Sequence, residues 1–136
     1  MSVQISRFLQ AGYPLNTDGD TAIWSSTQSA TTGAPSGLPT ASGGGYLQTS
    51  GVEWLDLWLT AATDAVEVTI YAYSAEAGAW CIDTAFAVSG VLSVPVGSWR
   101  YSHQALGADW VYVRITSVGS GGTITGQATL TQGCAK

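Results

Sequence analysis

Val66-Glu67-Val68-Thr69-Ile70-Tyr71-Ala72-Tyr73 is the stretch of this sequence that decides the fold class. Aliphatic residues occupy every second position, and polar or aromatic residues stand between them. Because successive side chains of a strand point to opposite faces, this period of two predicts a half-buried β-strand. The segment therefore predicts a sheet with one face against a core.

The same alternation returns in three further segments, 53–59, 110–116 and 123–130. Turn-forming residues separate these segments at 61–64, 74–78 and 119–122. Shorter strands are expected at 80–82, 86–88, 91–94 and 99–101, with possible edge strands near 3–8 and 22–24. About eight short strands at this spacing predict an all-β fold, a single antiparallel β-sandwich or jelly roll.

The composition agrees with a fold that has no helices. The 136 residues include only four Lys or Arg and nine Asp or Glu. Helix-rich soluble domains need these residues on their outer faces, whereas β-domains can cover their surface with Thr, Ser and Tyr. The length is sufficient for one domain with its own core.

The charge of the chain argues against two classes of partner. The net charge is −5, and Arg7, Arg100 and Arg114 are scattered along the sequence, so no cationic patch for phosphates is expected. The same acidity disfavours anionic membrane surfaces. No apolar run approaches the roughly 18 residues of a membrane span, and the N-terminus lacks the pattern of a signal peptide. We therefore expect neither nucleic acid nor membrane as a partner, and a protein made and used without export.

Residues 1–45 differ in character from the remainder. No charged residue occurs from Thr21 to Val52, and Ser, Thr and Gly dominate 25–50. We expect an N-terminal strand and an extended, loop-rich arm over 1–45, then a β-sandwich core over 46–136, together one structural domain. Spaced apolar residues punctuate the uncharged stretch from Thr21 to Val52, namely Ile23, Trp24, Leu38, Tyr46 and Leu47. Two interpretations stay open: the arm covers its own sheet, or it grips a neighbouring subunit.

The sequence contains no recognisable set of catalytic residues. His103 is the only histidine, it is expected in an exposed loop near a strand end, and no Gly-x-Ser-x-Gly motif is present. Glu53 and Asp56 lie near tryptophans, as any carboxylate in a Trp-rich strand would. We expect a protein that is not an enzyme.

No metal or cofactor is expected either. Residues 16–20 gather oxygen-bearing side chains around a glycine, but they lack the later glutamate of the helical calcium loop, so a turn is preferred to a calcium site at Asp18 and Asp20. Cys81 and Cys134 do not make a disulfide framework or a zinc site. Two free thiols are preferred, and a bridge between them stays open.

Aromatic residues are the most informative group for function. Six Trp and six Tyr exceed what a small sandwich needs for its core, and several alternate with aliphatic residues. On a one-sided sheet they would face outward and mark a contact surface, unless a covering loop buries them. The following residues are the candidates for an interaction surface: Trp24, Leu38, Tyr46, Trp54, Trp58, Tyr71 and Tyr73.

Two parts of the sequence carry a resemblance to known proteins. Residues 106–119, LGADWVYVRITSVG, followed by GGTIT at 121–125, resemble the closing hairpin of small β-domains in tailed-phage structural proteins. Residues 51–59 with 66–71 resemble their opening strand pair. The resemblance implies a capsid decoration (cement) protein or another virion component, assembled in the host cytoplasm. It also implies the major capsid protein or other virion proteins as partners, and a homo-oligomer with a trimer favoured.

A carbohydrate-binding module or lectin-like domain is the alternative. In that case Trp54, Trp58, Tyr71 or Tyr73 would stack on sugar faces, and Asp56 or Asn16 would bind hydroxyl groups. Most such modules are secreted or fused to an enzyme, and this sequence shows neither feature. Assembly is therefore preferred to sugar binding.

Overall fold

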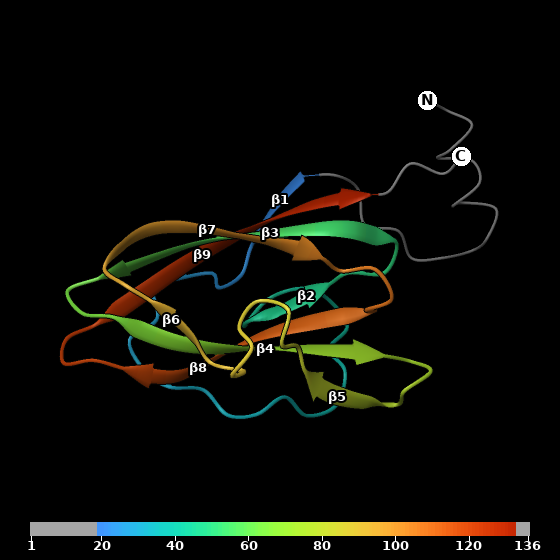
Figure 1. Ribbon diagram of the computed structural model, residues 1–136, viewed down its shortest axis with the longest axis horizontal. Coiled ribbons are helices and arrows are strands. Elements are labelled where there is room, and N and C mark those ends of the chain that lie inside the picture. Colours follow the sequence, from blue (N-terminus) through green and yellow to red (C-terminus); the bar gives the residue numbers. More distant parts are fainter. Residues whose placement is uncertain (1–18, 133–136) are drawn as a thin grey trace.

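The structure is a computed structural model that describes residues 19–132, and it is all-β (Figure 1). All pairings between its strands are antiparallel. No helix in this part of the chain is long and apolar enough to cross a membrane. The strands are β1 (Gly19–Ala22), β2 (Tyr46–Gln48), β3 (Val52–Ala62), β4 (Val66–Ser74), β5 (Ala79–Ile82), β6 (Leu92–Val94), β7 (Gly97–Gln104), β8 (Trp110–Val118) and β9 (Thr123–Gln132).

The strands form two stacked sheets, which confirms the predicted β-sandwich. One sheet has the order β1-β9-β3-β7, and the other has the order β2-β8-β4-β5, with β6 pairing to another part of β4. Most connections cross between the sheets, so most strands that are neighbours in a sheet are far apart in the sequence; the β4–β5 hairpin is an exception. This alternation of two interleaved four-strand orders is the jelly-roll arrangement.

The core lies between the sheets and is built from the alternating positions that the sequence indicates. Leu55, Leu57 and Leu59 of β3 are fully buried, and β4 opposes them with Val66, Val68 and Ile70. β8 and β9 add further aliphatic residues, among them Val113, Ile115, Ile124 and Ala128. The period of two thus places one face of each long strand in the core.

The described part of the arm, residues 19–45, belongs to the same domain. The Ile23 amide donates to the Gly126 carbonyl at 3.0 Å, and Gln28 exchanges two backbone hydrogen bonds with Ile124. Ile23 and Trp24 are both buried in the common core. The possible strand near 3–8 lies outside the described residues.

The prediction of a strand at 86–88 was wrong. Residues 86–88 form turns, and only Leu92–Val94 forms a strand between β5 and β7. In Figure 1 the connection from β5 to β6 runs between β7 and β4. Its residues Phe86 and Ala87 pack against the core. An apolar triplet of this length can fill a core from a loop as well as from a strand, because burial alone does not require a ladder.

Candidate functional site

The outer face of the β2-β8-β4-β5 sheet is covered by the protein's own arm. The aromatic rings on this face of the sheet contact one another. The ring centroids are 4.3 Å apart for Tyr46 and Tyr112, and 5.4 Å apart for Tyr73 and Trp80. The Tyr112 hydroxyl donates to the Gly33 carbonyl at 3.0 Å, and the Trp80 indole donates to the Gly37 carbonyl at 3.1 Å. This aromatic cluster consists of Tyr46, Tyr71, Tyr73, Trp80 and Tyr112.

Further hydrogen bonds hold the arm on this sheet. The Thr32 amide donates to the Ile115 carbonyl, and the Thr32 hydroxyl accepts from the Ile115 amide, each at 2.9 Å. Arg114 donates to the Thr32 carbonyl and to the Tyr71 hydroxyl. Of the two interpretations of the arm, the structure therefore supports the self-covering one for residues 19–45. Burial under the arm explains why Tyr112 does not face solvent.

The predicted interaction residues accordingly fall into three groups. Trp24 is 5% exposed and belongs to the core, so its assignment to an interaction surface was wrong. Tyr46, Tyr71 and Tyr73 are half-buried beneath the arm. Trp54, Trp58 and Leu38 remain exposed, and only the two tryptophans share one sheet face.

The outer face of the β1-β9-β3-β7 sheet carries the exposed rings of Trp54 and Trp58, and a polar network crosses it. Asp56 is buried within this face and accepts hydrogen bonds from Ser102 and from Arg100, whose nearest nitrogen is 3.1 Å away. The Arg100 guanidinium also lies 5.2 Å from the Trp58 ring centroid, a cation–π distance.

The network continues from the Trp58 ring to the other edge of the sheet. The Trp58 indole donates to the Thr129 hydroxyl at 2.8 Å, and that hydroxyl donates to Asp20 at 2.7 Å. Cross-strand pairing sets these positions, since Trp58 lies opposite both Arg100 and Gln127. This sheet face therefore presents a tryptophan whose ring is held by neighbours on β7 and β9.

A third surface lies along the edge strand β7. β7 pairs only with β3 in its sheet, so its other backbone edge has no strand partner among the described residues. The residues from Ile82 to Leu106 include most of the exposed large hydrophobic side chains of this part of the chain. We use the name β7 side for the exposed large hydrophobic residues of this segment, which are Ile82, Val88, Val91, Val96, Trp99 and Leu106. Sequence reasoning missed it because these residues lie in short strands and turns without a clear period.

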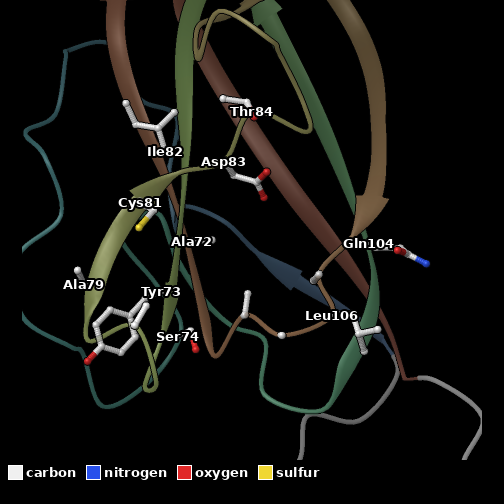
Figure 2. Close-up of a pocket in the computed structure, with 14 residues that line it drawn as sticks. Ala72, Tyr73, Ser74, Ala79, Cys81, Ile82, Asp83, Thr84, Gln104 and Leu106 are labelled. Atoms are coloured by element: carbon white, nitrogen blue, oxygen red, sulfur yellow. The ribbon is translucent and has the colours of Figure 1, made fainter.

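A pocket of about 360 Å³ lies where the β4–β5 hairpin meets the turn after β7 (Figure 2). Cys81 and Asp83 line it, and the Asp83 carboxylate accepts the Ala85 amide at 2.9 Å. Its lining residues include neither a histidine nor a second carboxylate. Without a base beside the thiol, this lining does not make an activated nucleophile.

His103 lies within β7, so the expectation of an exposed loop histidine was wrong. Its ring is half-buried and lies 5.8 Å from the Phe86 ring, and its Nδ1 lies 3.2 Å from the Gln104 carbonyl oxygen. Neighbouring Tyr101 packs against the core, and burial raises the pKa of its phenol. These contacts are those of a packing residue on an edge strand.

Among residues 19–132, no group of three His, Cys, Asp or Glu side chains could hold a metal ion. Asp20 accepts a hydrogen bond from Thr129, whereas Asn16 and Asp18 lie outside the described residues. Cys81 is exposed on β5, and Cys134, its possible disulfide partner, lies outside the described residues.

Comparison of the chain with protein-family models, with curated proteins and with solved structures finds no match.

Proposed function

We propose that this protein is a non-enzymatic structural protein that assembles with copies of itself through the β7 side. The observation that carries the proposal is the combination of an unpaired edge strand with exposed apolar residues on both ends of it. An unpaired edge is a template for another chain, and monomeric proteins usually protect such edges with Lys, Pro or bulges. The sequence of β7, GSWRYSHQ, contains neither Lys nor Pro, and its pairing with β3 is unbroken from Ser98 to Gln104.

The charge distribution favours a second copy of this chain as the occupant. The net charge of −5 makes whole molecules repel one another. Residues 82–106, however, contain one acidic residue, Asp83, and one basic residue, Arg100. The β7 side therefore adds no like-charge repulsion when two copies meet there.

We further propose that the assembled protein is a component of a tailed-phage virion, as a capsid decoration (cement) protein with the major capsid protein as its neighbour. The resemblance of residues 51–71 and 106–125 to phage structural domains supports this context. Jelly rolls occur in viral capsid and lectin domains, which is support by analogy of fold alone. The decisive measurement is quantitative mass spectrometry of purified virions, in which the chain should be present in many copies.

Light scattering on the purified full-length protein tests the assembly itself. We expect a closed small oligomer, with a trimer favoured. Val88→Glu and Leu106→Glu, at side chains 93% and 71% exposed, should shift it to monomer without lowering the melting temperature. Leu38→Glu is the matched control, because it adds the same charge at an exposed leucine on the arm. A native protein that stays monomeric at micromolar concentration, or a control that dissociates equally, would refute assembly through the β7 side.

A further inference from the structure

A groove of about 380 Å³ lies beside Trp58, where the chain leaves β1 and passes the end of β9. We call it the Trp58 groove. Its volume falls within the range of small-ligand sites, roughly 300–1,000 Å³. The groove is lined by Trp24, Ser25, Ser26, Thr27, Trp58, Thr60, Thr125, Gly126 and Gln127.

The aromatic wall of the groove is held in place before any ligand binds. Trp58 is 44% exposed, yet its indole N–H donates a hydrogen bond to Thr129 and its ring lies within cation–π distance of Arg100. Arg100 is itself fixed by Asp56. A ring immobilised in this way loses little further rotamer freedom on binding, so its contact area contributes more fully to affinity.

The remaining walls are polar but uncharged. Apart from the two tryptophans and Gly126, every lining residue has a side chain with a hydroxyl or an amide group. The exposed ones include Ser25, Ser26, Thr27, Thr125 and Gln127. Hydroxyls and amides both donate and accept hydrogen bonds. No Asp, Glu, Lys, Arg or His lines the groove.

This lining selects the chemistry of a ligand. An ionic ligand would find no opposite charge in the groove, and a wholly apolar ligand would desolvate the hydroxyls without replacing their hydrogen bonds. A neutral saccharide satisfies both requirements, because a sugar ring has an apolar C–H face and hydroxyl groups around its rim. We propose that the Trp58 groove binds a neutral saccharide, with a ring face on Trp58 and hydroxyl groups on Thr27, Thr125 and Gln127.

The proposal goes beyond assembly and does not depend on it, since the groove and the β7 side share no residue. In a virion, such a site would let the surface of the particle hold on to a neutral glycan. Loss of assembly and loss of sugar binding are therefore separate outcomes. The Val88→Glu and Leu106→Glu variants should still bind the saccharide with the affinity of the native protein.

The test uses the full-length protein on an array of neutral oligosaccharides (glucans, galactans, mannans and N-acetylglucosamine oligomers), with isothermal titration of the strongest binder. Trp58→Ala and Gln127→Ala should each weaken binding at least about tenfold, which corresponds to about 1.4 kcal/mol. Trp54→Ala is the matched control: it lies on the same strand and face and is 39% exposed, but it does not line the groove. Its affinity should stay within about twofold of the native protein's.

Two results would overturn the proposal. One is a native protein that binds no neutral oligosaccharide on the array. The other is an equal loss in Trp54→Ala and Trp58→Ala, which would indicate contact with exposed tryptophans in general. Should circular dichroism show that Trp58→Ala is unfolded, the exposed Gln127→Ala variant decides, because its side chain takes no part in the core.

Discussion

At the scale of single residues, Gly126 sets how closely the arm packs on β9. A Cβ at this position would stand 2.8 Å from Ile23 Cδ1, 2.9 Å from Leu59 Cδ2 and 3.0 Å from Trp24 Cζ3. Three large side chains thus occupy the space that a side chain at 126 would need. The glycine allows Trp24 to close the core beside β9, and Trp24 and Gly126 also line the Trp58 groove.

Gly126→Ala should therefore destabilise the protein by about 1–3 kcal/mol, because it overpacks a filled site. Gly33→Ala is the matched control, since a Cβ there meets nothing within 4 Å and Gly33 does not have a positive φ. It should change stability little, or raise it by up to about 1 kcal/mol through the unfolded chain. Urea unfolding followed by tryptophan fluorescence measures both; equal midpoints for the two variants would contradict the close packing at Gly126.

At the scale of elements, the arm acts as the cover of one sheet. Its polar residues are anchored by backbone bonds to β8 and β9 at Thr32 and Gln28, and its apolar residues Ile23 and Trp24 enter the core. The aromatic cluster beneath it is thereby partly shielded from solvent. The described part of the arm thus stabilises its own domain.

Trp24→Ala should destabilise the protein by about 3–5 kcal/mol, as large truncations in a core do. Leu38→Ala, in the same arm but 50% exposed, should stay within about 0.5 kcal/mol of the native stability. Thermal melts by circular dichroism compare the two variants. If Trp24→Ala left the melting temperature unchanged but abolished an oligomer, the arm would be gripping a neighbour instead of covering its own sheet.

At the scale of the whole molecule, charge and apolar surface are distributed unequally. The acidic residues responsible for the net charge of −5 lie mainly outside residues 82–106, where Asp83 and Arg100 balance. The exposed large hydrophobic residues are concentrated on that side. A contact between two copies would therefore be opposed by the long-range repulsion between their net negative charges. It would be favoured by burial of the exposed hydrophobic residues of the β7 side.

Added salt should therefore strengthen self-association. Raising NaCl from about 20 to about 300 mM shortens the screening length from roughly 20 Å to about 6 Å and removes repulsion between acidic copies, while an apolar contact is left intact. Sedimentation velocity at fixed protein concentration should show a larger oligomer fraction at the higher salt concentration. Dissociation on adding salt would instead indicate that ion pairs hold the copies together.

The sequence by itself determined the fold class and the inward face of the long strands. Val66 to Tyr73, and the leucines of β3 between Trp54 and Trp58, have the period of two that a strand imposes on any half-buried sheet. Trp54 and Trp58 alternate with these leucines and are exposed, which is one of the two outcomes that the sequence left open. An apolar triplet at 86–88 had no such repeat, and there the prediction of a strand was wrong.

Only the tertiary structure decided which outward aromatic residues stay exposed. Tyr71 and Tyr73 alternate with aliphatic residues as Trp54 and Trp58 do, yet residues 32–37 lie over the sheet of the two tyrosines, whereas the two tryptophans on the other sheet are exposed. The Trp58 groove likewise joins residues 24–27 to β3 and β9, across long sequence separations. Periodicity reports the face on which a side chain stands, but the cover of that face depends on contacts between distant segments, which local pattern does not encode.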